Sequence, residues 1–149
     1  MSNETIGRPM EVLLVEDSLT DAALAIGALK QSKIKHRTTL VRDGLEALAF
    51  LHREGRFARA PSPDLVLLDL LLPKMNGLDV LEDIRADEEL QHIPIVILTS
   101  SDTEEDQFRA ESFHVESYIT KPVNLQKFVA VVRELRSHWH SDLILPALD

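Results

Sequence analysis

Five polar side chains in this sequence each stand at the end of a short run rich in Val, Leu and Ile. They are Glu16, Asp17, Asp69, Thr99 and Lys121. If the runs are parallel strands, their carboxyl ends share one edge of a sheet, which is where ligands bind in open α/β folds. The five side chains are then expected to converge on one site.

The types of these side chains predict phosphoryl chemistry. The carboxylates of Glu16, Asp17 and Asp69 would repel one another unless a proton or a cation lay between them. A hard ion such as Mg²⁺ prefers such oxygen ligands. A cation that also faces a lysine and a threonine suits a phosphoryl group, with Lys121 as a point charge and the Thr99 hydroxyl as a donor. Asp69 would then be the in-line nucleophile that forms an aspartyl phosphate.

Each of these residues also has an ordinary explanation when taken alone. Asp69 could cap the loop after its strand, Lys121 could be a solvated charge, and Thr99 could simply end a strand. Glu16 and Asp17 would suit the start of a helix, where the macrodipole favours acidic groups. Their joint placement at the ends of separate strands favours the phosphoryl site.

The elements that must position this site alternate along the chain. The expected strands are Val12 to Val15, Arg37 to Val41, Leu65 to Leu68, Ile93 to Leu98 and Val115 to Ile119. Helical apolar spacing follows each strand, and the expected capping residues are Ser18, Asp43, Asp102 and Asn124. Nearly unbroken apolar runs indicate strands buried on both faces. Five βα repeats therefore predict an α/β fold with a doubly wound parallel sheet.

The composition fits one acidic domain. The chain has 149 residues, of which 44% are hydrophobic and 28% charged, and this excludes disorder throughout. It has no Cys, which excludes disulfides and thiolate-bound metals. A net charge of −9 makes nucleic acid and anionic membranes unexpected partners. No apolar leader or membrane-spanning run is visible, so a cytoplasmic protein is expected.

Four motifs resemble those of the receiver domain of two-component response regulators. In chain order they are Leu13 to Asp17, Leu67 to Gly77, Leu98 to Ser101 and Tyr118 to Pro122. The resemblance predicts a receiver at residues 11–137 with the flavodoxin-like strand order 2-1-3-4-5. It implies a phosphoprotein that accepts a phosphoryl group from a sensor histidine kinase. Such a protein catalyses its own phosphotransfer and dephosphorylation and is not otherwise an enzyme.

The resemblance also implies a role for each residue of the acidic pocket. Asp69 is the phospho-acceptor. Glu16 and Asp17 form the Mg²⁺ pocket together with Asp69, and the main-chain carbonyl of Leu71 is a further metal ligand. Glu16 stands where many members of the family have Asp, and a glutamate there would reach the metal through water.

The remaining implied roles concern the response to phosphorylation. Thr99 and Tyr118 take the positions of the family's switch pair, and Lys121 that of the lysine that contacts the phosphate. The Lys121–Pro122 bond is a candidate for the cis form, which is accessible to X–Pro bonds.

A narrower resemblance links the chain to single-domain regulators that partner bacterial phytochrome histidine kinases. It rests on the basic loop from His52 to Pro63 and on the tail that contains Trp139. Residues 138–149 are expected to form a short tail without an effector domain, so that output takes place by protein contact.

The last helix and the tail carry an unusually large apolar surface. An exposed patch of this kind usually marks an interface. We therefore predict a homodimer through the face of Phe128, Val132 and Leu135 together with the C-terminal tail. The alternative is a tail folded back on its own domain.

Three other functions are compatible with parts of the pattern. A receiver that acts as an adaptor without phosphorylation is disfavoured because the acceptor set is intact. A hydrolase of the aspartyl-phosphate type normally has a second Asp at the position of Leu71. A flavin-binding module of the same topology is disfavoured because Glu16 and Asp17 would repel the flavin phosphate.

Overall fold

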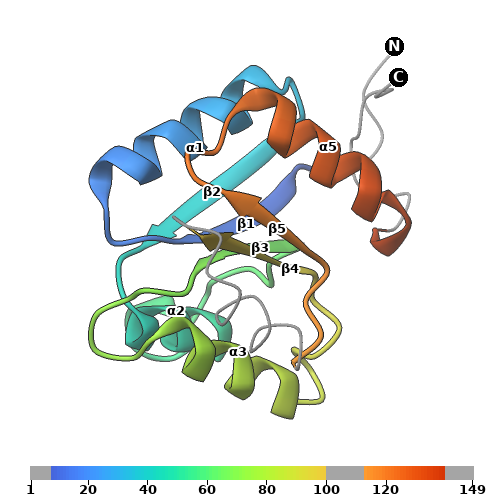
Figure 1. Ribbon diagram of the computed structural model, residues 1–149. Helices are drawn as coiled ribbons and strands as arrows, with labels where there is room; N and C mark the ends of the chain where they lie inside the picture. Colours follow the sequence, from blue (N-terminus) through green and yellow to red (C-terminus); the bar gives the residue numbers. More distant parts are fainter. Residues whose placement is uncertain (1–7, 100–112, 140–149) are drawn as a thin grey trace.

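The computed structural model describes residues 8–99 and 113–139. Its centre is a sheet of five parallel strands in the order β2-β1-β3-β4-β5, which confirms the predicted fold and strand order (Figure 1). The strands are β1 Met10–Val15, β2 His36–Val41, β3 Leu65–Asp69, β4 Ile95–Thr99 and β5 Ser117–Thr120.

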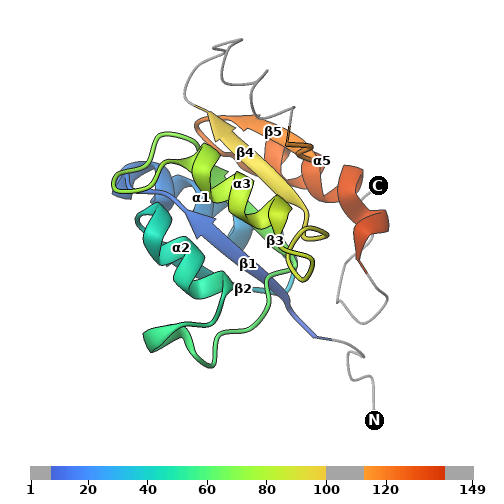
Figure 2. The same cartoon turned by 90° about the horizontal axis from the view of Figure 1, so that it is seen from below.

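Helices cover both faces of the sheet. Helices α1 (Leu19–Gln31) and α5 (Leu125–Leu135) lie on one face, and α2 (Gly44–Leu51) and α3 (Gly77–Ala86) on the other (Figures 1 and 2). Short 3-10 turns span Gly55–Phe57 and Arg136–His138. The helix expected after Asp102 lies outside the described residues. Within residues 8–99 and 113–139, no helix has the length and apolar character needed to span a membrane.

The apolar side chains form one core on each face of the sheet. Along β1, Val12 and Leu14 enter the core beneath α1 and α5, whereas Leu13 and Val15 enter the core beneath α2 and α3. All residues of β3 and β4 are buried. Burial on both faces explains why these strands are continuous apolar runs instead of alternating ones.

Side-chain caps fix where the helices begin. The predicted caps Ser18, Asp43 and Asn124 each accept a hydrogen bond from a backbone N–H three residues later. Asn76 caps α3 in the same way, which was not predicted. Because each cap directly follows a strand or its loop, the helix starts hold the loops at the carboxyl ends of the strands in place.

The predicted dimer face is wrong. Phe128, Val132 and Leu135 are 1%, 0% and 2% exposed, because they pack into the core between α5, α1 and the sheet. The beginning of the tail folds back, since the Trp139 indole N–H donates to the main-chain oxygen of Asp64 at 2.7 Å. The rest of the predicted tail, residues 140–149, lies outside the described residues.

A partly buried ion pair at the amino end of β5 was also not predicted. The Arg85 guanidinium lies 3.0 Å from Glu116 Oε1, and the two side chains are 12% and 10% exposed. Arg85 also donates to the main-chain oxygens of Gln91, Ile93 and Phe113. Glu116 in turn accepts from the backbone N–H of Ile95. This network joins the end of α3 to the segments that enter β4 and β5.

Replacing Arg85 by Met is expected to lower the free energy of unfolding by about 1 to 3 kcal/mol, because the partly buried Glu116 carboxylate and three main-chain oxygens would lose their donor. Denaturant unfolding monitored by circular dichroism measures this change. The matched control is Arg53→Met at an exposed position, with an expected change within about 0.5 kcal/mol. Equal effects of the two substitutions would contradict the assigned role of Arg85.

Candidate functional site

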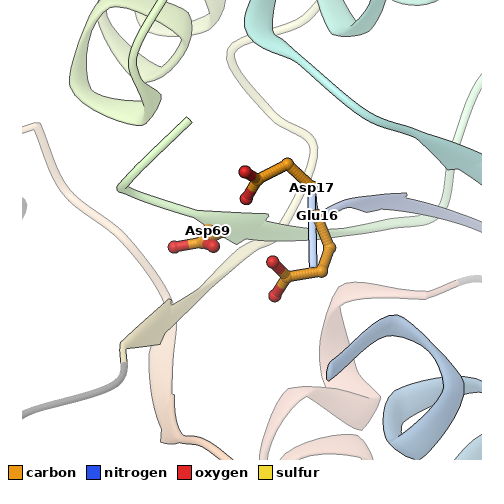
Figure 3. A group of neighbouring side chains, drawn as sticks. All are labelled: Glu16, Asp17 and Asp69. Carbon is orange, nitrogen blue, oxygen red and sulfur yellow. The ribbon is translucent and has the colours of Figure 1, made fainter. Parts of the chain in front are cut away.

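The carboxyl ends of β1 and β3 bring three carboxylates together. Glu16 and Asp17 follow β1, and Asp69 is the last residue of β3. One oxygen from each carboxylate lies within 4.8 Å of the other two, and Figure 3 shows the three side chains gathered around one space. Glu16 and Asp69 are buried, whereas Asp17 is exposed. The predicted convergence of these residues is therefore confirmed in the geometry.

Backbone hydrogen bonds set the positions of the two buried carboxylates. The backbone N–H of Ser18 donates to Glu16 Oε2 at 3.1 Å, and that of Leu71 donates to Asp69 Oδ1 at 3.0 Å. Each carboxylate thus has one oxygen held by the loop that follows its own strand. These hydrogen bonds orient both side chains at the ends of their strands.

Lys121 bridges two of the three carboxylates. Its ammonium nitrogen is 2.7 Å from Glu16 Oε1 and 2.8 Å from Asp69 Oδ2. The backbone N–H of Lys121 donates to the main-chain oxygen of Thr99 at 2.8 Å, so the loop after β5 stays attached to the end of β4. The Lys121–Pro122 peptide bond is cis, as anticipated.

Burial and hydrogen bonding at the site shift two pKa values. Burial raises the pKa of Glu16 to about 7, although the hydrogen bond with Lys121 acts in the opposite direction. Burial alone would lower the pKa of Lys121, but hydrogen bonds with Asp69 and Glu16 outweigh it and raise this pKa above its usual value. Lys121 is therefore a permanent cation, and Glu16 can take up a proton near neutral pH.

The predicted switch residues lie on the two strands at this edge of the sheet. Thr99 is the buried last residue of β4, paired in register with Thr120 of β5. Tyr118 lies in β5, is partly buried, and packs against the core beneath α2 and α3. Leu71 follows Asp69 by two residues and its side chain is 67% exposed.

The loop between Asp69 and α3 leaves no room for a side chain at Gly77. A Cβ there would overlap the main-chain oxygen of Asp69 and the Cα of Leu70. The backbone N–H of Gly77 donates to the main-chain oxygen of Leu70 at 2.9 Å. Glycine thus lets α3 begin directly against the backbone that carries Asp69.

A sequence profile of the response regulator receiver domain matches residues 12–133. The chain belongs to this family. Among its relatives, the response regulator Rcp1 of Synechocystis sp. strain PCC 6803 is 42% identical over 147 residues, which covers 99% of each chain.

Solved receiver structures share the fold. The Mn²⁺-bound form of Rcp1 has a TM-score of 0.75 at 42% identity and covers 93% of this chain and 100% of its own. The phosphorylated cyanobacterial phytochrome response regulator RcpA has a TM-score of 0.77 at 42% identity, with 94% and 100% covered. The bacteriophytochrome response regulator RtBRR has a TM-score of 0.81 at 40% identity, with 93% and 86% covered.

The acidic group of this receiver fits a divalent cation. It offers three carboxylates from two strand ends, and hard divalent ions prefer oxygen donors. The single ammonium of Lys121 does not neutralise all three carboxylates when they are ionised. A divalent cation would supply the missing positive charge. Glu16, Asp17 and Asp69 are the residues that would hold it.

Two further residues of the receiver touch the site and were not singled out in the sequence. Asp21, in the first turn of α1, places Oδ2 at 3.3 Å from the Lys121 ammonium. Arg42, just after β2, donates to the main-chain oxygen of Asp17 at 2.7 Å. Asp21 lies inside a helix, so the strand-end rule could not find it, and only its contact with Lys121 shows that it belongs to the site. Arg42 directly follows β2, so the strand-end rule could have found it.

The affinity for Mn²⁺ is expected to depend on pH through Glu16. Below about pH 7 a cation must displace the Glu16 proton, so affinity should rise toward pH 7 and level off above it. Calorimetric titration of the wild type and of Glu16→Gln between about pH 5.5 and pH 8 measures this dependence. The variant should bind more weakly with a flatter profile. A wild-type affinity that is constant over this range would contradict the assignment.

Proposed function

We propose that Asp69 accepts a phosphoryl group from the phosphohistidine of a sensor histidine kinase. The observation that carries this proposal is the Asp69 carboxylate itself, held by the Leu71 backbone N–H and the Lys121 ammonium beside two further acids. A buried carboxylate in a fixed orientation, next to a permanent cation, is suited to in-line attack on phosphorus.

The transfer conserves atoms and charge. A carboxylate oxygen of Asp69 attacks phosphorus, the P–O bond of an acyl phosphate forms, and the P–N bond to the kinase histidine breaks. The electron pair of that bond returns to the imidazole. Lys121, now 2.8 Å from Asp69 Oδ2, is placed to contact an oxygen of the transferred group. No external general base is required, because a carboxylate oxygen attacks without having to lose a proton.

We assign the divalent cation as Mg²⁺, held by Glu16, Asp17, Asp69 and the main-chain carbonyl of Leu71. When bound, Mg²⁺ neutralises charge on phosphoryl oxygens. The oxygen donor set and the Mn²⁺-bound form of Rcp1 support a hard divalent ion.

Output would follow from movement at the β4 and β5 strand ends. The Thr99 hydroxyl would turn toward the phosphoryl group, and the ring of Tyr118 would move inward. Beside Tyr118, a groove of about 340 Å³ runs between β5 and α5, and Ala130 and Val131 contribute to its lining. A partner seated in this groove would sense the position of Tyr118 directly.

We place this receiver in phytochrome light signalling as a stand-alone, cytoplasmic regulator. The relatives RtBRR and RcpA are named as a bacteriophytochrome and a phytochrome response regulator, and the alignment with Rcp1 covers 99% of that chain. The domain at residues 11–137 would then carry the entire response, with residues 138–149 as its tail.

A second copy of this chain is our proposed partner at the β5–α5 groove. The face of α5 toward the sheet is buried in the core, so the contact would use the outer surface of α5 and the edge of the sheet at β5. The groove lining combines an aromatic residue, small apolar residues and one charge of each sign, Lys127 and Glu134. A two-fold pairing could match each charge with its opposite.

Phosphotransfer from a bacterial phytochrome histidine kinase tests the proposed function. The radiolabel of the autophosphorylated kinase should move to the wild type in the presence of Mg²⁺, and transfer to Asp69→Asn should be lost, because an amide oxygen is a poor nucleophile. Asp79→Asn, at an exposed position in α3, is the matched control and should accept label normally. Unchanged labelling of Asp69→Asn would contradict the acceptor, and no labelling of folded wild type would favour the adaptor function.

Light scattering at micromolar concentration, with and without beryllofluoride, tests the dimer. The wild type is expected to have the mass of a dimer in at least the beryllofluoride form. Ala130→Arg should return it to the mass of a monomer, because a charged side chain would fill the groove. Leu45→Arg, on the exposed surface of α2, is the control and should not change the mass. A monomer under both conditions would refute the proposal.

A further inference from the structure

The ammonium of Lys121 has three N–H donors and three carboxylate neighbours. Glu16 Oε1, Asp69 Oδ2 and Asp21 Oδ2 lie at 2.7 Å, 2.8 Å and 3.3 Å. These acids come from the ends of β1 and β3 and from the first turn of α1. Two of the three, Glu16 and Asp69, also belong to the group that fits a divalent cation.

Lys121 and a divalent cation therefore compete for the same carboxylates. In this structure the carboxylates of Glu16 and Asp69 neutralise the Lys121 ammonium. A cation bound to them would use the same negative charge, and the two positive groups would repel each other. Lys121 must then find another partner or turn toward solvent. A displaced lysine in solvent would no longer be available to a phosphoryl group on Asp69.

Asp21 differs from Glu16 and Asp69 because it contacts Lys121 without belonging to the cation-binding group. Its carboxylate stands beside the cation-binding group and not within it. Its side chain is 32% exposed, so the carboxylate keeps part of its hydration and pays little desolvation cost at this position. Its backbone N–H donates to the cap Ser18 at 3.2 Å, which fixes the turn that presents the side chain to Lys121.

We propose that Asp21 is a positioning residue that retains Lys121 at the site when a cation occupies Glu16 and Asp69. It offers the ammonium an acceptor that the cation does not need, and so lowers the cost of displacing Lys121 from the metal ligands. This inference rests on the proposed function for its purpose. The predicted effect itself does not require phosphotransfer. Asp21 should influence cation affinity through Lys121 in either case.

A double-mutant cycle on Mn²⁺ affinity tests the coupling. Asp21→Asn should weaken Mn²⁺ binding by about threefold or more, because Lys121 would pair more tightly with Glu16 and Asp69. Lys121→Gln should bind Mn²⁺ more tightly than the wild type, because the competitor is gone. In the Lys121→Gln background, Asp21→Asn should have little further effect. Electron paramagnetic resonance of free Mn²⁺ gives each affinity, with Lys121→Met as the replacement if Lys121→Gln does not fold.

Simple long-range attraction between Asp21 and the cation is the competing explanation. It predicts the same loss from Asp21→Asn with and without Lys121, and that result would overturn the proposal. Asp21→Glu, which keeps a carboxylate, should recover part of the affinity, and no recovery would count against the proposal. The Mn²⁺ assay needs no phosphoryl group. Its result can therefore be interpreted even if phosphotransfer to Asp69 fails.

Discussion

The site depends on one electrostatic interaction, the repulsion between carboxylates gathered at the carboxyl ends of β1 and β3. Glu16 and Asp69 are buried, so their mutual repulsion is only weakly screened by water. Lys121 relieves the repulsion with a single cation 2.7 Å and 2.8 Å from them. The remaining negative charge is what makes the pocket receptive to a divalent ion. Metal binding and the readiness of Asp69 to react are two consequences of the same excess charge.

The fold holds the residues of this site in defined positions. Burial of β1, β3 and β4 on both faces fixes their register, and the register fixes which residue ends each strand. At the strand ends, helix caps and backbone hydrogen bonds hold the connecting loops in place. Gly77 allows α3 to begin against the backbone of Asp69, and the bond from Lys121 to Thr99 ties β5 to β4. Each acid or base of the site is therefore placed by an element that also packs a core.

The sequence predicted the local features well because each has a local cause. Unbroken apolar runs located the strands, and Ser18, Asp43 and Asn124 marked the helix starts through hydrogen bonds within one turn. The site residues followed from the strand ends and the topology. Strands β4 and β5 begin two residues later than predicted, and β1 begins two residues earlier, because apolar patterning locates the centre of a strand better than its ends.

Features that depend on contacts distant in sequence were missed or misassigned. The apolar face of Phe128, Val132 and Leu135 was predicted to be a dimer interface, but α1 and the sheet cover it. Amphipathic spacing shows that a face is apolar and does not show what covers it. The Arg85–Glu116 pair spans 31 positions, and Asp21 meets Lys121 across 100, so no spacing rule connects them.

A crystal structure with Mg²⁺ and beryllofluoride tests the central claim most directly, that Lys121 is shared between the carboxylates and a phosphoryl group on Asp69. We predict beryllofluoride on Asp69, Mg²⁺ against Glu16, Asp17 and Asp69, and the Lys121 ammonium within hydrogen-bond distance of a fluoride. Beryllofluoride on another residue would contradict the account. So would a Lys121 ammonium that still bridges Glu16 and Asp69 with the cation bound.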